Sequence, residues 1–124
     1  MKTDYWVSGL FYALDALDTA AVMKLFADDA TLRFGNAEPA VGREQVEATM
    51  TGFFAIIAGL HHETTGVWTG TWPGGEVKCI ESDVTYIRHD GSQVGPLPVT
   101  TTLRLEGGRI RHYQIFMDAS PVFA

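Results

Sequence analysis

The second half of the chain is a series of four strand-like segments separated by glycine-containing turns, and this pattern restricts the possible folds more than any other feature. The segments cover residues 64–71, 76–88, 98–105 and 109–117. The turns between them read Pro73-Gly74-Gly75, His89-Asp90-Gly91 and Glu106-Gly107-Gly108. Apolar segments joined by such turns are typical of hairpins. The pattern therefore predicts an antiparallel sheet.

The first half has helical spacing instead. Apolar residues recur at intervals of three and four in residues 5–17, 20–26 and 43–60. Asp18 or Thr19 suits the N-cap position of the second helix, and residues 30–34 form a short strand. Helices followed by hairpins predict one α+β domain over residues 1–124, with three helices packed on one face of a curved, mostly antiparallel sheet.

Charge and cysteine content exclude several classes of function. The net charge is -6 at pH 7, and the 9 Lys and Arg residues are scattered. Nucleic acids and anionic membranes favour clustered basic residues, so neither is an expected partner. No segment approaches the length of a membrane span. Cys79 is the single cysteine, so no disulfide forms within the chain, and we expect a cytoplasmic location.

Asp118 ends the last strand-like segment. With the two-residue period of a strand, Asp118 shares a face with Ile110 and Phe116, so its carboxylate would face apolar surroundings. Such burial raises the pKa of a carboxyl group and suits it to proton transfer. The alternative is that Asp118 only closes the strand, because Pro121 follows and aspartate is common in turns. Asp118 is the first candidate catalytic residue.

Glu81 and Asp83 share one face of an earlier strand. If Asp83 lies close to Asp118, one carboxyl group keeps its proton and acts as an acid while the other acts as a base. The alternative places Glu81 and Asp83 near an open rim in contact with water, the usual environment of acidic side chains. Asp83 is the second candidate catalytic residue.

His62 follows the apolar end of the third predicted helix. From there it could reach an interior pocket and shuttle protons near neutral pH. The alternative is a structural hydrogen bond, which is the commoner role of a lone histidine. His61, His62 and Glu63 do not form a metal set, because adjacent side chains point apart and no third ligand has suitable spacing. We predict neither a metal nor a cofactor.

Several stretches of the chain resemble the nuclear transport factor two-like superfamily. They read LFADDATL at residues 25–32, GREQV at 42–46 and GRI at 108–110. Residues 62–63, 84–91 and 113–121 resemble its SnoaL-like branch. The superfamily includes ketosteroid isomerase, limonene epoxide hydrolase and SnoaL-like polyketide cyclases, so the resemblance indicates the fold far better than the reaction.

The resemblance implies a cone-shaped α+β barrel whose sheet wraps around an apolar pocket capped by the helices. It also implies a small hydrophobic ligand or substrate, and a homodimer formed through the outer sheet face. We expect the substrate-binding residues to be Glu81, Phe34, Phe54, Ile57, Thr101, Leu103, Phe116 and Gln114.

The active-site residues of ketosteroid isomerase are not matched. The positions of its base, its oxyanion-binding tyrosine and its acidic partner fall at Phe34, Leu10 and Thr101. The resemblance therefore disfavours steroid isomerisation by that mechanism.

Limonene epoxide hydrolase is matched in part. Its two catalytic aspartates fall at Asp83 and Asp118. Its arginine falls at Glu81, and its tyrosine and asparagine fall at Leu32 and Phe34. SnoaL-like cyclases, which rely on an aspartate with few helpers, are the least demanding match.

Two functional hypotheses follow. The first is an enzyme that binds an apolar oxygenated substrate and uses carboxylate acid/base chemistry, as a cyclase, isomerase or epoxide hydrolase. The second is a non-catalytic ligand-binding or dimerisation module of the same fold.

Overall fold

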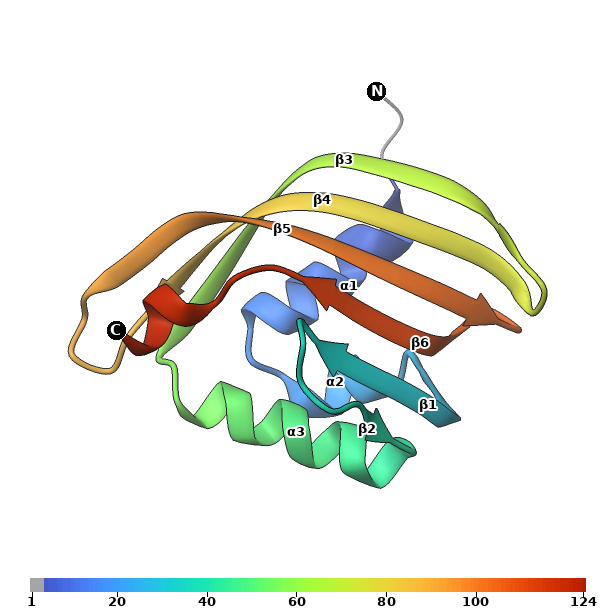
Figure 1. Ribbon diagram of the computed structural model, residues 1–124, viewed down its shortest axis with the longest axis horizontal. Coiled ribbons are helices and arrows are strands. Elements are labelled where there is room, and N and C mark those ends of the chain that lie inside the picture. Colours follow the sequence, from blue (N-terminus) through green and yellow to red (C-terminus); the bar gives the residue numbers. More distant parts are fainter. Residues whose placement is uncertain (1–3) are drawn as a thin grey trace.

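The computed structural model describes residues 4–124. Its first half holds three helices and two strands, and its second half is a meander of four further strands (Figure 1). The elements in chain order are α1 (Tyr5–Asp15), α2 (Thr19–Met23), β1 (Phe26–Phe34), β2 (Ala40–Val41), α3 (Arg43–Ala55), β3 (Gly59–Trp72), β4 (Gly75–Ile87), β5 (Gln93–Glu106) and β6 (Arg109–Phe116). A 3-10 turn at Ser120–Phe123 completes the described part of the chain.

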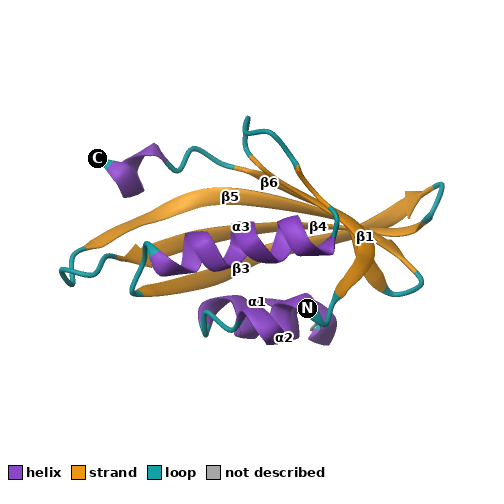
Figure 2. Cartoon of the chain, turned by 90° about the horizontal axis from the view of Figure 1, so that it is seen from below, coloured by secondary structure: helices purple, strands orange, loops and turns teal. Residues whose placement is uncertain are grey.

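The six strands form one curved sheet in the order β2-β1-β6-β5-β4-β3. Every neighbouring pair is antiparallel except β1 and β6, which run parallel. The three helices lie on one face of the sheet, which arches over them without closing (Figures 1 and 2). This architecture confirms the predicted α+β class. Within residues 4–124, no helix is long and apolar enough to cross a membrane.

Several predicted boundaries are wrong. The third helix ends at Ala55 rather than near residue 60, because the chain from Gly59 onward pairs with β4. The second helix ends at Met23, and β1 already begins at Phe26. The short strand β2, which pairs with Thr31 and Leu32, was not predicted.

Aspartates are the N-cap residues of the first two helices. The Asp4 carboxylate accepts a hydrogen bond from the Val7 amide at 3.1 Å, and Asp18 accepts one from the Ala21 amide at 3.0 Å. Each bond satisfies an amide that has no partner within the first turn of its helix. Asp4 has a second role, because its other oxygen accepts a hydrogen bond from Lys78 Nζ at 2.7 Å. Asp4 therefore connects the start of α1 to the inner face of β4.

The inner face of β4 carries alternate residues of the strand. Ile80, Val84 and Tyr86 are buried beneath the helices, and Lys78 and Ser82 share their face. The apolar members of this set join one continuous core with residues from all three helices. Burying this face of β4 leaves Glu81 and Asp83 on the opposite face of the sheet.

The buried Ser82 hydroxyl gives a first prediction. Ser82 is 4% exposed, and its Oγ has no hydrogen-bond partner among residues 4–124. A buried hydroxyl without a partner costs about 1 to 3 kcal/mol. We therefore expect Ser82→Ala to raise the free energy of unfolding by about 1 kcal/mol, measured by urea denaturation. A loss of stability would contradict this account.

Candidate active site

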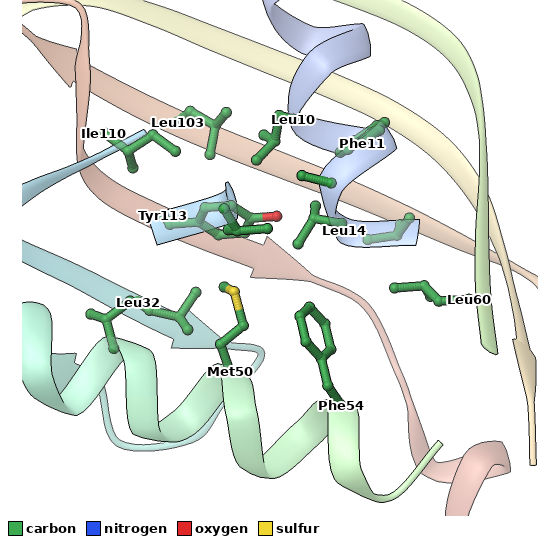
Figure 3. Packing of buried hydrophobic residues seen from close by; sticks show 14 of the residues in the cluster. Leu10, Phe11, Leu14, Leu32, Met50, Phe54, Leu60, Leu103, Ile110 and Tyr113 are labelled. Atoms are coloured by element: carbon green, nitrogen blue, oxygen red, sulfur yellow. The ribbon is translucent and has the colours of Figure 1, made fainter. Parts of the chain in front are cut away.

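A pocket of about 140 Å³ lies between the helices and the inner face of the sheet. Figure 3 shows Met50 and Phe54 of α3 on one side of this region, with Leu14 and Tyr113 facing them. Thr49 is exposed, so the pocket opens beside α3. The lining residues are Leu14, Leu32, Phe34, Thr49, Met50, Phe53, Phe54, Leu60, His62, Tyr86, Thr101, Tyr113, Ile115 and Met117.

His62 is held in the pocket wall by Asp15, the last residue of α1. Its Nδ1 lies 2.6 Å from Asp15 Oδ1, and its backbone amide donates to Asp15 Oδ2 at 3.0 Å. The imidazole stacks on Phe11, with ring centroids 4.4 Å apart, and the side chain is 11% exposed. Because Nδ1 donates to a carboxylate, Nε2 carries the free lone pair and can accept a proton.

Two tyrosines and two threonines, Thr49 and Thr101, supply further hydroxyl groups. Burial raises the pKa of Tyr86 to about 12, and it raises the pKa of Tyr113 well above its usual range. Both tyrosines therefore stay protonated at neutral pH and act as hydrogen-bond donors. The Tyr86 hydroxyl donates to Met117 Sδ at 3.4 Å. Thr101 is buried on the neighbouring strand β5 and also lines the pocket.

Four of the predicted site residues line the pocket, namely His62, Phe34, Phe54 and Thr101. Ile57 and Leu103 are buried but do not line it, contrary to expectation. Ile57 lies past the end of α3, so it has left the helix face that meets the pocket. Leu103 pairs with Tyr113 in the sheet, and the longer tyrosine side chain reaches the pocket in its place.

The expectation that Glu81 and Asp83 face the interior is wrong. Glu81 is exposed and Asp83 is half-buried, on the face that does not carry the buried residues of β4. The apolar residues Ile80 and Val84 occupy the interior instead, because burying two carboxylates without partners would cost far more free energy.

The expectation that Asp118 faces apolar surroundings is also wrong, and a β-bulge explains why. Leu105 pairs with Ile110 but Arg104 pairs with His112, so the extra residue Arg111 reverses the alternation along β6. Tyr113, Ile115 and Met117 then face inward and line the pocket. Gln114 and Phe116, both predicted to bind substrate, are placed outside the pocket together with Asp118.

Asp118 lies in water beyond the end of β6. Its Oδ1 accepts a hydrogen bond from the Ser120 amide at 2.9 Å, and this bond lowers the carboxyl pKa. The direction is opposite to the raised pKa that burial would have produced. The position of Asp118 agrees with the alternative hypothesis, in which this residue only closes the strand.

Sequence reasoning missed Asp15, Tyr86 and Tyr113. The alternation of Ile80, Val84 and Tyr86 indicated which face of β4 is buried, and it could have identified Tyr86. The bulge hid Tyr113, and nothing in the local sequence indicates that Asp15 meets His62 across 47 residues. Within the described range 4–124, no three His, Cys, Asp or Glu side chains gather as metal ligands would.

A curved sheet that encloses an apolar pocket under three helices defines the nuclear transport factor two-like class of α+β domains. The family model described as the SnoaL-like domain matches residues 7–113. The chain therefore belongs to the SnoaL-like family, and the resemblance noted in its sequence is confirmed. No curated protein matches the chain by sequence.

Solved structures share the fold at low sequence identity. A protein from Catenulispora acidiphila with a ketosteroid isomerase-like fold, in complex with trimethylamine, is 23% identical with a TM-score of 0.81, over 98% of this chain and 91% of that one. A protein from Jannaschia named as a SnoaL-like polyketide cyclase is 18% identical, with a TM-score of 0.80. The match covers 94% of this chain and 85% of that one. An epoxide hydrolase of Mycobacterium tuberculosis, similar to limonene epoxide hydrolase, is 16% identical, with a TM-score of 0.73. The match covers 94% of this chain and 83% of that one.

Proposed function

We propose that this chain is an enzyme that transfers a proton on a small, apolar, oxygenated substrate, with His62 as the base. The observation that carries the proposal is the pairing of His62 with Asp15 at the wall of an apolar pocket. A carboxylate on Nδ1 fixes the orientation of the ring and stabilises the imidazolium formed when Nε2 takes a proton.

The proposed reaction removes a proton from carbon beside a carbonyl group. Nε2 takes the proton, and the electron pair of the broken C–H bond moves into the carbonyl to give an enolate. The imidazolium then returns the proton, to the same carbon or to another position of the conjugated system. Isomerisation and cyclisation both begin with this step. The neutral hydroxyls around the pocket support it, because they can donate to the enolate oxygen.

This proposal moves the chemistry from the carboxylates to the imidazole. Asp83 and Asp118, two of the three catalytic residues expected from the sequence, are not pocket-lining residues, whereas the third, His62, is one. A base must reach the proton that it removes, within hydrogen-bond distance or through one water. The test is deuterium exchange at the α-carbons of cyclohexanone in D₂O, followed by NMR for the native protein and for His62→Asn and Asp118→Asn.

We also propose that the chain forms a homodimer through the outer face of the sheet. Members of this fold family commonly dimerise and commonly bind small hydrophobic ligands. Trp68 and Phe116, which are 54% and 55% exposed, lie on this face. Exposed aromatic side chains on one face of a sheet are typical of an interface.

The dimer gives a prediction for solution measurements. We expect the double variant Trp68→Lys with Phe116→Lys to be a monomer by light scattering at concentrations where the native chain is a dimer, because each lysine would need to lose its hydration at the interface. The matched control is Tyr5→Lys with Tyr12→Lys, two exposed residues on α1. A monomeric native chain would refute the proposal.

A further inference from the structure

Within the described residues, the lining of the pocket holds no permanently charged side chain. Among residues 4–124, its lining contains no Lys, Arg, Asp or Glu side chain. The Asp15 carboxylate is already engaged by His62, at 2.6 Å. Bringing an ion into such surroundings without a counter-charge costs several kcal/mol. The ligand that suits this pocket is therefore uncharged.

One hydrogen-bond donor in the pocket is unused. Tyr113 is 4% exposed and lines the pocket, and its hydroxyl takes part in none of the side-chain hydrogen bonds found within residues 4–124. Figure 3 shows this hydroxyl pointing away from the strand, toward Leu14 and Phe54. Tyr86 differs, because its hydroxyl already donates to Met117. A buried donor that opens onto a cavity is satisfied when a ligand oxygen accepts from it.

The rest of the wall suits a ring. The ring centroid of Phe53 lies 6.0 Å from that of Phe34 and 5.8 Å from that of Tyr86, and the Phe53 and Tyr86 rings meet edge to face. These rings, with the aliphatic side chains of Leu14, Met50 and Leu60, enclose the apolar part of the pocket. Its volume of about 140 Å³ is close to that of an apolar protein cavity of about 150 Å³ that accepts benzene. One ring fills this volume, and a fused polycyclic skeleton would have to extend out through the opening beside α3.

We propose that the substrate class is an uncharged single-ring ketone, with its carbonyl oxygen hydrogen-bonded by Tyr113 and its ring among Leu14, Phe53 and Leu60. The proposal rests on the site proposed above as catalytic, and it adds the size, charge and anchoring group of the ligand.

The test is a set of four probes titrated into the native protein, with binding followed by methyl NMR signals of Leu14, Leu60 and Ile115. Cyclohexanone is the probe of the expected class. Methylenecyclohexane has the same shape but replaces the carbonyl oxygen with a CH₂ group. Cyclohexanecarboxylate adds a charge, and a four-ring steroid ketone adds size. We expect cyclohexanone to bind more tightly than each of the other three.

Tyr113→Phe tests the anchoring group without removing the ring. We expect the variant to bind cyclohexanone about tenfold more weakly, the effect of one net hydrogen bond in an apolar site, and to bind methylenecyclohexane as the native protein does. Equal weakening of both probes, or of neither, would overturn the assignment of Tyr113. Binding of the steroid or the carboxylate at least as tightly as cyclohexanone would overturn the substrate class.

Binding and turnover separate this inference from the proposed function. If cyclohexanone binds as described but its α-protons do not exchange, the substrate class stands and the catalytic role of His62 fails. If exchange is catalysed only on polycyclic ketones, the catalytic role stands and the substrate class fails.

Discussion

His62→Asn is expected to slow the exchange of cyclohexanone α-protons by about 10²- to 10⁴-fold, the usual contribution of a general base. Asparagine can still meet the Asp15 carboxylate with its side-chain amide, but it cannot accept a proton. The loss should therefore appear in the rate constant, while the Kd for cyclohexanone changes by less than about threefold. NMR measurement of exchange rates and of binding on the same samples checks both parts.

Asp118→Asn is the matched control for His62→Asn. It also replaces a titratable residue with asparagine, but at an exposed position after β6. We expect native exchange rates for this variant. If Asp118→Asn abolished exchange and His62→Asn did not, the chemistry would belong to the carboxylate that the sequence first indicated, and the imidazole would be a structural residue.

Asp4→Ala is expected to lower the free energy of unfolding by about 2 to 3 kcal/mol, because two interactions are lost together. The variant removes the hydrogen bond to the Val7 amide that begins α1. It also removes the partner at 2.7 Å from Lys78, whose side chain is 10% exposed. Lys78 then keeps Glu76, at 3.3 Å, and the Trp6 ring, whose centroid is 5.8 Å from Nζ. Urea denaturation at neutral pH measures the change.

A comparison of Asp4→Ala with Asp18→Ala isolates the contribution of the Lys78 contact to the free energy of unfolding. Asp18 caps α2 as Asp4 caps α1, with nearly equal distances of 3.0 and 3.1 Å, but no lysine contacts it among the described residues. We expect Asp18→Ala to cost about 1 kcal/mol, the typical effect of one cap. Equal losses in the two variants would mean that the Lys78 contact contributes nothing.

The contribution of Asp4 to the free energy of unfolding should also depend on pH. Burial acts to raise the pKa of Asp4, but the hydrogen bonds from Lys78 and from the Val7 amide, together with the positive charge of Lys78, outweigh it and hold the pKa below its ordinary value of 3.8. A carboxyl group with a lowered pKa in the folded state stabilises that state above its unfolded pKa and stops doing so as the pH falls through the folded pKa. The difference in stability between the native chain and Asp4→Ala should therefore be full at neutral pH and shrink below about pH 3.8.

The hydrophobic pattern was sufficient for the elements of the fold but not for their ends. The spacing of apolar residues in α1 and the glycine turns after β3 and β5 are local signals, and the structure follows them. The end of α3 is not local. Residues 56–60 continue the helical pattern, but Gly59 and Leu60 gain partners in β4, and strand pairing prevails over helical propensity there.

The site was less predictable because one residue of register reverses the face of a strand. Regular alternation in β6 placed Asp118 inside with Ile110, whereas the bulge at Arg111 places Tyr113 inside. In β4 the apolar alternation of Ile80 and Val84 was the better guide. The resemblance to epoxide hydrolase pointed to Asp83 instead, at a position that this chain leaves outside the pocket.

The sequence by itself determined the fold class and the family, because periodicity, turn residues and short motifs are properties of neighbouring residues. Only the tertiary structure decided which polar groups share the pocket. Asp15 and His62 meet because the end of α1 packs against β3, and Tyr113 reaches the same cavity because of a bulge. These contacts arise from the packing of distant segments, and no local pattern in the chain encodes them.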